Sequence, residues 1–325
     1  MTYAIELRAL RKAFGPRVAV DDFDLAIPTG ALVGFIGPNG AGKTTTIRMV
    51  MSIIFPDRGT IKVLGRASAV ESKDRIGYLP EERGLYKKMK VGAFLAYMAR
   101  LKGMDGDGLD NRVQTWLERV GLGDCAKKRC EELSKGMQQK VQFISAVIHE
   151  PDLLILDEPF SGLDPVNSRV LRGLIDEQHR AGKTIIFSTH QMSQAEALCD
   201  RIVMIHQGRK VLDDTPGAIR SRFDPRAVEL EAGKPNVAAA LGALPEVVST
   251  HAHNGRVRVE LREGVEAAEM IPRLASVTGA HRIEVVRPTL EDIFIEIVQD
   301  TVAESERELL RASLRNGGRG DRGGD

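Results

Sequence analysis

The sequence predicts an α/β fold with a parallel sheet, a helical insertion and a small α+β domain after it. Three observations lead to this fold class. A glycine-rich loop at residues 37–45 joins a buried apolar strand to a helix, strand and helix signals alternate from Leu153 to Leu212, and short alternating strands follow Pro225. Alternating strands and helices are typical of a parallel sheet that is covered by helices on both faces.

Short apolar runs predict the strands of the first domain, which we assign to residues 1–220. These strands are Ile5–Leu10, Val18–Ile27, Ala31–Ile36, Gly59–Gly65, Leu153–Leu156, Thr184–Ser188, Ile202–Ile205 and Lys210–Leu212. The first two are expected to form an antiparallel edge sheet, and the last two a hairpin around Gln207-Gly208.

Apolar residues at helical spacing predict the helices of this domain. They are Lys43–Ile54, Val91–Leu101, Asp110–Val120, Gln138–Ile148, Val166–Ala181 and Gln191–Cys199. Three of them follow one another with no strand between them. We therefore expect a helical subdomain at about residues 86–150 within the α/β framework.

Residues 225–300 are predicted to form a small α+β domain of the ferredoxin-like type. Their strands and helices are expected in the order β-α-β-β-α-β, which is typical of that fold. The pair Asn254-Gly255 marks a hairpin within it. The last ten residues hold five glycines together with charged residues, so we expect a disordered tail over residues 301–325.

Length and composition limit the class of protein. The chain has 325 residues, of which 42% are hydrophobic, and a net charge of +1 that gives no reason to expect a nucleic-acid partner. Cys125, Cys130 and Cys199 form no C-x-x-C pair and are expected to be reduced thiols of a cytosolic protein. The longest uncharged run, Leu25–Gly42, is broken by glycines and prolines, so no membrane span or signal peptide is predicted.

The loop from Gly37 to Thr45 fits G-x-x-x-x-G-K-[ST], the pattern of a phosphate-binding loop. Glycines allow the backbone N–H groups to approach the phosphates, Lys43 would pair with the β- and γ-phosphates, and the Thr44 hydroxyl would bind Mg²⁺. The strand before the loop and the helix after it favour this interpretation over an unrelated glycine-rich turn. The positions assigned to nucleotide binding are Gly37, Pro38, Asn39, Gly40, Ala41, Gly42, Lys43, Thr44 and Thr45.

Two acidic residues, Asp157 and Glu158, follow the apolar strand Leu153–Leu156. An aspartate at the carboxyl end of a strand can hold Mg²⁺ through its water shell, and Glu158 would polarise the attacking water. A strand that ends in two solvated acids would look the same. The phosphate loop upstream and the segment Pro159–Pro165 downstream favour the magnesium interpretation.

Three further positions carry possible contacts to a nucleotide. Ser134 has an N-cap residue type ahead of a helix, Gly136 permits close backbone approach, and the free N–H groups of a helix start bind anions. His190 follows a predicted strand and is either a hydrogen-bonded core histidine or a contact to the γ-phosphate that positions Glu158. Phe14 either packs in the core or stacks on an adenine ring.

Together these residues resemble the ATP-binding subunit of an ABC transporter over residues 1 to about 220. Six motifs occur in the order of that family: Phe14 at the adenine position, Walker A at Gly37–Thr45, the signature motif at Ser134–Gln138, Walker B at Leu153–Glu158, the D-loop at Ser161–Asp164 and the switch histidine His190. The resemblance implies a P-loop NTPase fold of the ABC type. It also implies ATP contacts from Phe14, Ser134, Gly136, Gln138 and Asp164, catalytic roles for Lys43, Glu158 and His190, and a magnesium site at Thr44, Asp157 and Glu81.

Two departures from the family pattern are visible. The usual signature is L-S-G-G-Q, and here Lys135 and Met137 stand at its third and fifth positions. Glu81 takes the place of the Q-loop glutamine, where it offers oxygen to Mg²⁺ or water but cannot donate as an amide does. The form Y-L-P-E-E-R-G-L-Y around Glu81, and the segment Arg287–Phe294, are similar to a bacterial exporter subgroup that includes sodium-export and antibiotic-export ATPases.

The resemblance implies an ATPase that couples ATP hydrolysis to transport. Its expected partner is a polytopic membrane permease made by another chain. It further implies a homodimer of ATP-binding domains, no nucleic acid, and a place on the cytoplasmic face of the membrane. Two alternatives stay open, which are a soluble ABC-type ATPase that acts on ribosomes or DNA and a regulatory ATP sensor. One Walker A motif, no sustained heptads and no zinc spacing argue against the first alternative. The cargo is not determined.

Overall fold

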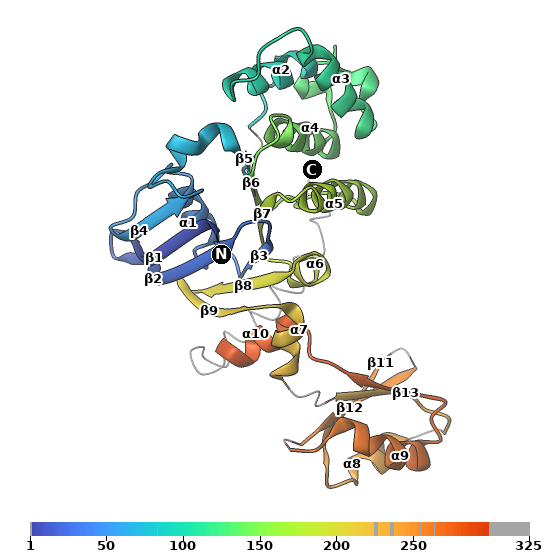
Figure 1. The fold of residues 1–325 in the computed structure, drawn as a ribbon. Coiled ribbons are helices and arrows are strands. Elements are labelled where there is room, and N and C mark those ends of the chain that lie inside the picture. The colour runs from blue at the N-terminus through green and yellow to red at the C-terminus, as the bar shows by residue number, and fades with distance from the viewer. Residues whose placement is uncertain are drawn as a thin grey trace. The chain divides into compact units, whose positions relative to one another are not determined.

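The computed structural model describes residues 2–82, 84–223, 227–234, 237–253, 255–262 and 264–298. The tail that was predicted to be disordered, residues 301–325, lies outside these ranges, as does Asn254 of the predicted hairpin turn. The described chain divides into two compact units between Asp214 and Thr215 (Figure 1). The sequence prediction had placed this boundary at residues 220–225.

The first unit is built on a six-stranded sheet with the strand order β5-β6-β7-β3-β8-β9. Its strands are β3 (Leu32–Ile36), β5 (Ile76–Leu79), β6 (Leu153–Asp157), β7 (Thr184–Thr189), β8 (Arg201–His206) and β9 (Arg209–Asp214). All neighbours are parallel except the β8–β9 hairpin. Strands β3, β6 and β7 are buried along their whole length, which explains their continuous apolar sequences. The predicted α/β class is confirmed.

A second, antiparallel sheet in this unit has the order β2-β1-β4. Its strands are β1 (Tyr3–Phe14), β2 (Arg17–Pro28) and β4 (Arg58–Val63). The β1–β2 hairpin is longer than predicted, because pairing continues to Phe14 and Arg17 at its tip. Its apolar face joins β3 and the helix α1 (Lys43–Val50) in one hydrophobic core. The hairpin tip is thereby carried to the end of the sheet where the phosphate loop lies.

Six helices accompany the sheets of the first unit. They are α1 (Lys43–Val50), α2 (Val91–Leu101), α3 (Leu109–Arg119), α4 (Lys135–Val147), α5 (Pro165–Arg180) and α6 (Met192–Leu198), with short 3-10 helices at Ala69–Arg75, Gly123–Cys125 and Cys130–Glu132. The predicted end of α1 at Ile54 is wrong, because the backbone of Ser52 is left-handed, with a φ of 56°, and a right-handed helix cannot contain it. The predicted start of α4 at Gln138 is also wrong, because Ser134 caps the helix and its Oγ accepts from the Met137 N–H at 3.3 Å.

The second unit begins with α7 (Pro216–Ser221) and contains a four-stranded antiparallel sheet. Its elements are β10 (Ala227–Glu231), α8 (Val237–Gly242), β11 (Val247–His253), β12 (Arg256–Leu261), α9 (Ala267–Thr278), β13 (Arg282–Val286) and α10 (Leu290–Val298). The sheet order β11-β12-β10-β13 is that of a ferredoxin-like fold, so the predicted β-α-β-β-α-β order is confirmed. Apolar side chains of the sheet and of α8 and α9 form its core.

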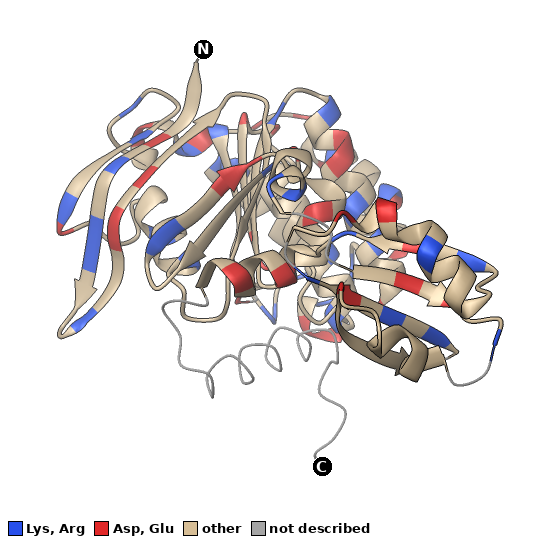
Figure 2. Ribbon diagram, turned by 90° about the horizontal axis from the view of Figure 1, so that it is seen from below, with Lys and Arg blue, Asp and Glu red and all other residues tan. Residues whose placement is uncertain are grey.

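Charge and thiol chemistry agree with the composition. Lys and Arg are interspersed with Asp and Glu along the elements of each unit (Figure 2). Cys125, Cys130 and Cys199 are free and buried. None of the helices in the described part of the chain has the length and apolar character that a bilayer crossing requires.

Candidate active site

The phosphate loop connects the carboxyl end of β3 to the first turn of α1. Gly42 forms the N-cap of α1 with a φ of 112°, and a Cβ on it would lie 2.5 Å from the Ala19 carbonyl oxygen. Only glycine fits this position, because both the backbone angle and the space exclude a side chain. The Thr46 N–H donates to the Gly42 oxygen at 2.9 Å, so the loop leads directly into the helix. The local sequence therefore forms a rigid loop in front of a helix start, the arrangement that binds phosphates.

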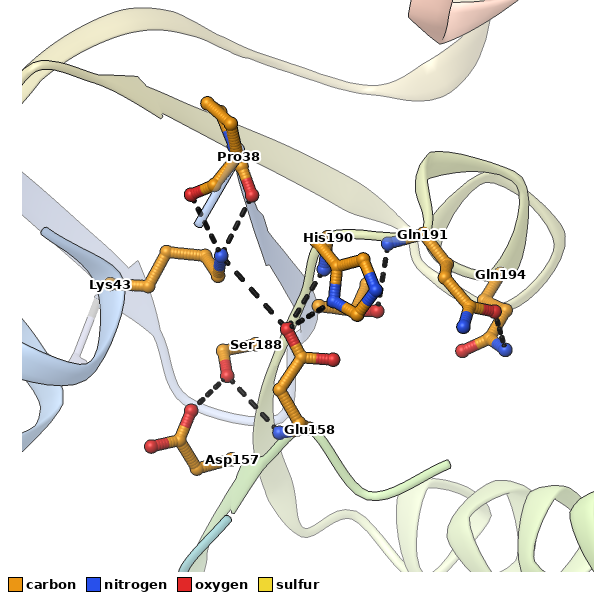
Figure 3. A network of polar contacts seen from close by, with 10 residues as sticks. Pro38, Lys43, Asp157, Glu158, Ser188, His190, Gln191 and Gln194 are labelled. Atoms are coloured by element: carbon orange, nitrogen blue, oxygen red, sulfur yellow. Dashed lines mark hydrogen bonds and ion pairs between the residues drawn. The ribbon is translucent and has the colours of Figure 1, made fainter. Parts of the chain in front are cut away.

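Lys43 is held inside this loop with only 6% of its side chain exposed. Its Nζ donates to the carbonyl oxygens of Gly37 at 2.7 Å and Pro38 at 3.2 Å, and lies 3.9 Å from Glu158 Oε1 (Figure 3). Burial lowers the pKa of Lys43, while the nearby carboxylates of Glu158 and Asp157 act in the opposite direction. The ammonium group is thus positioned where phosphate oxygens would enter the loop.

Asp157 ends β6 and lies beside Ser188 of the neighbouring strand β7. The Ser188 hydroxyl donates to Asp157 Oδ1, whereas Asp157 Oδ2 is buried and has no hydrogen-bond partner among the described residues. Burial raises the pKa of Asp157, and the hydroxyls of Ser188 and Thr44 act against that shift. A buried, unpartnered carboxylate oxygen beside a threonine hydroxyl has the oxygen chemistry that Mg²⁺ prefers.

Glu158 is the least relaxed residue of the site. Its backbone is left-handed, with a φ of 48°, a conformation that costs about 1–3 kcal/mol for a residue with a side chain. The Glu158 N–H donates to the Ser188 carbonyl oxygen at 3.1 Å and approaches the Ser188 Oγ at 3.2 Å, which holds this geometry. This left-handed backbone directs the Glu158 side chain toward Lys43.

His190 fixes the Glu158 carboxylate from the next strand. Its backbone N–H and its ring Nδ1 both lie 2.9 Å from Glu158 Oε1 (Figure 3). The hydrogen bond to Glu158 raises the pKa of His190 above its ordinary value, against the effect of burial. The structure shows His190 bonded to Glu158, while a contact of His190 to a γ-phosphate stays a prediction.

Lys43 and Glu158 face a pocket of about 550 Å³, a volume suited to a small-molecule ligand. Its lining residues are Phe14, Arg17, Ala19, Asn39, Gly40, Gly42, Lys43, Thr44, Thr45, Glu81 and Glu158. Half of the Phe14 side chain is exposed, so the ring is free to stack, and the Lys12 ammonium lies 5.5 Å from its centroid. Glu81 and Glu158 also line a second pocket of about 410 Å³ together with Glu82, Gln139 and Ser161.

Sequence reasoning missed three residues of this site. Arg17 and Ala19 line the pocket because the β1–β2 hairpin extends to the phosphate loop, where Arg17 Nη2 lies 3.5 Å from the Gly40 oxygen. Ser188 bonds Asp157 and Glu158, as described above. The sequence signal that could have identified Ser188 was its hydroxyl near the carboxyl end of a predicted strand.

Seven of the predicted nucleotide contacts do not line the pocket, namely Ser134, Gly136, Gln138, Asp164, Gly37, Pro38 and Ala41. The first three belong to the start of α4, and Asp164 is the N-cap of α5. The Gln138 amide donates to the carbonyl oxygens of Cys130 at 3.2 Å and Leu133 at 3.1 Å, within its own segment. Pro38 and Ala41 belong to the turn of the loop itself, where the Ala41 N–H donates to the Pro38 oxygen at 3.2 Å.

The contact between His190 and Glu158 predicts a pH dependence of stability. A raised pKa in the folded state means that protonated His190 stabilises the fold below its unfolded pKa of about 6.5. This contribution is lost as the pH rises through the folded-state pKa. We expect His190→Gln to lower the free energy of unfolding most below about pH 6.5, and progressively less as the pH rises through the raised folded-state pKa of His190. Urea denaturation across this range tests it, with the exposed His251→Gln as control, and a penalty that grows with pH would contradict it.

Comparison with known proteins places similar sequences along almost the whole chain. Residues 20–161 match the family model described as ABC transporter, and residues 215–298 match that of the C-terminal domain of ATP-binding proteins like DrrA1-3. An uncharacterized ABC transporter ATP-binding protein of Bacillus subtilis, YhaQ, is 41% identical over 88% of this chain and 96% of its own length.

A relative with a stated role is the Nod factor export ATP-binding protein I of Sinorhizobium fredii. It is 33% identical over 90% of this chain and 85% of its own length. Among solved structures, an ATP-binding subunit of an ABC transporter aligns with a TM-score of 0.63 and 32% identity, over 68% of this chain and 93% of that chain.

Proposed function

The chain belongs to the family of ABC transporter ATP-binding proteins, and from this premise we propose that it is the motor of an exporter whose membrane permease is a separate chain. Members of this family bind and hydrolyse ATP, so the protein is an ATPase. The export direction is supported by the Nod factor export relative. An exporter motor of this kind would work at the cytoplasmic face of the membrane.

One observation carries the proposed chemistry, which is the chain of contacts from His190 through Glu158 to Lys43. ATP would lie with its adenine on Phe14 and its phosphates in the loop that ends at Thr45. Lys43 would neutralise charge on the γ-phosphate as it develops. Glu158, held by His190, would orient the attacking water and draw its proton during in-line displacement.

The residues present also fit a magnesium ion bound with the nucleotide. Among the described residues no group of three or more His, Cys, Asp or Glu is close enough to hold a metal without other ligands. Thr44, Asp157 and Glu81 would hold Mg²⁺ together with phosphate oxygens and water, the ligands that Mg²⁺ prefers. The ion would supply positive charge between the β- and γ-phosphates.

Four of the predicted contacts outside the pocket, Ser134, Gly136, Gln138 and Asp164, support a head-to-tail homodimer. Ser134 is exposed and stands at the start of α4, where free N–H groups favour an anion. In a pair of copies, Ser134, Gly136, Gln138 and Asp164 of one would meet the γ-phosphate bound by the other. Loss of that phosphate would release the pair, a switch biased by the ligand.

The helical subdomain offers a surface for the permease. Tyr86 packs edge-to-face against both Phe94 and Tyr97, yet 53% of Tyr86 and 40% of Tyr97 stay exposed. Exposed aromatic clusters are typical of protein interfaces. This cluster follows Glu81 along the chain, so the segment Glu81–Leu101 would carry nucleotide-driven motion to the membrane partner.

A tagged pull-down from detergent-solubilised membranes of the native host tests the proposed function. We expect mass spectrometry to identify a co-purifying polytopic membrane protein. Recovery from the soluble fraction with ribosomal or DNA-bound proteins would overturn it in favour of a nucleic-acid ATPase. A soluble ATPase without any membrane partner would favour a regulatory ATP sensor.

The magnesium assignment predicts a weaker metal site in Glu81→Gln. Burial and the neighbouring charges of Asp157 and Glu158 raise the pKa of Glu81, so its carboxylate interacts with these two acids. Replacing Glu81 with glutamine would remove one negative charge from the proposed metal site. We expect the affinity of the ATP-bound protein for Mn²⁺ to fall about tenfold, as measured by electron paramagnetic resonance of free Mn²⁺. Glu82→Gln is the control, because Glu82 does not line the nucleotide pocket. Equal Mn²⁺ affinity in both variants would remove Glu81 from the metal site.

A further inference from the structure

The start of α4 lies against Asn167, in the first turn of α5. A Cβ on Gly136, near the start of α4, would lie 2.6 Å from Asn167 Nδ2 and 3.1 Å from its Cγ. The three nearest atoms that this Cβ would meet all belong to Asn167. Such distances are shorter than van der Waals contact, so Asn167 occupies the space that a side chain at residue 136 would need.

Two hydrogen bonds hold Asn167 to the residue that caps its own helix. Its backbone N–H donates to Asp164 Oδ1 at 2.8 Å, and its Nδ2 donates to Asp164 Oδ2. Both oxygens of the residue that caps α5 are therefore bound by Asn167. Moving the amide away from Gly136 would break the bond to Asp164, because an asparagine side chain is short and has few alternative rotamers.

We propose that Asn167 is a positioning residue that locks the start of α4 to the start of α5, and that Gly136 is a glycine because Asn167 fills the place of its Cβ. The proposal rests on the proposed function, in which Ser134, Gly136 and Asp164 face the nucleotide of a second copy. Because Asn167 holds the two helix starts together, these three residues form one continuous surface. They reach or leave the partner's phosphate together.

The competing explanation is that residue 136 must be glycine only because the partner's nucleotide approaches it. The two explanations differ in a protein without nucleotide. Alanine is intrinsically better than glycine in a helix, so Gly136→Ala would stabilise α4 if nothing filled the space. The contact with Asn167 reverses this sign.

Thermal unfolding of the nucleotide-free protein tests the lock directly. We expect Gly136→Ala to lower the unfolding midpoint by about 2–4 °C, and the same substitution in an Asn167→Ala background to leave it unchanged or raise it. Gly173→Ala within α5 is the matched control, since a Cβ there meets nothing within 4 Å. An equal loss in both backgrounds, or no loss in either, would overturn the proposal.

The positioning role is tested by ATP-dependent dimerisation in a Glu158→Gln background. We expect Asn167→Ala to weaken the dimer about fivefold to tenfold while ATP affinity of the monomer changes less than about twofold. In this background, Gly136→Ala combined with Asn167→Ala should dimerise as well as Asn167→Ala alone. Asn111→Ala, a matched substitution in the first turn of α3, should have no effect.

The outcomes separate the two proposals. If Gly136→Ala weakens the dimer equally with and without Asn167, the nucleotide requires the glycine and the lock has no positioning role. If the Glu158→Gln parent forms no dimer with ATP, the proposed head-to-tail mechanism fails. The unfolding comparison then still decides whether Asn167 locks the two helix starts.

Discussion

Glu158→Gln is expected to slow ATP hydrolysis by about 100-fold or more while ATP binding remains. The Glu158 side chain is only 8% exposed and is held at 2.9 Å by His190, so its orientation is set before a nucleotide enters. Glutamine keeps the shape and an oxygen that can accept from the His190 N–H. It cannot take a proton from water, so the chemical step alone is lost.

Single-turnover hydrolysis and light scattering with ATP and Mg²⁺ measure the two parts of this expectation. The variant should bind ATP with wild-type affinity and accumulate as an ATP-bound dimer. Glu82→Gln serves as the control, since it changes a neighbouring carboxylate that lines only the second pocket. Hydrolysis by Glu158→Gln at the wild-type rate would show that another group activates the water.

Lys43→Ala is expected to lower ATP affinity by about 10- to 100-fold, because charge-assisted hydrogen bonds to phosphate are each worth about 1.5–3 kcal/mol. Lys43 is buried in the loop and its ammonium already lies against the Gly37 and Pro38 oxygens. Removing it deletes the main positive charge at the γ-phosphate position and also the cost of burying that charge. Folding stability should therefore change much less than binding.

Calorimetric titration with ATP, together with the unfolding midpoint of the free protein, separates binding from folding. Lys62→Ala on β4 is the matched control, because it removes an exposed ammonium that does not line the nucleotide pocket. Unchanged ATP binding by Lys43→Ala would contradict the placement of the nucleotide in this loop.

Much of the fold followed from local patterns. The apolar runs at β3, β6 and β7 were recognisable because strands buried on both faces need no polar residue along their length. The parallel sheet also explains why three of the motifs lie together. The carboxyl ends of parallel strands meet at one edge, so a loop after β3, an acidic pair at β6 and a histidine after β7 had to lie close together.

Other elements could not be predicted with this reasoning. Strand β5, Ile76–Leu79, was missed because four residues carry little periodic signal and its strand state depends on pairing with β6. The start of α4 was placed too late, because the capping bond of Ser134 decides it and the first turn is polar and exposed. The order of elements in the second unit was predicted because each strand and each helix shows its own periodic pattern of apolar residues.

Residue order along the chain was sufficient for the family motifs, the fold class and the grouping of Lys43, Asp157 and Glu158. The motifs depend on spacing within a strand, loop or helix, which neighbouring residues control. Their grouping follows from the parallel sheet, because the carboxyl ends of its strands lie at one edge. The bond from Ser188 to Asp157, the place of Arg17 in the pocket and the contact of Asn167 with Gly136 depended on the tertiary structure. They join segments that are distant in sequence, and their distances are set by how sheets and helices pack against one another.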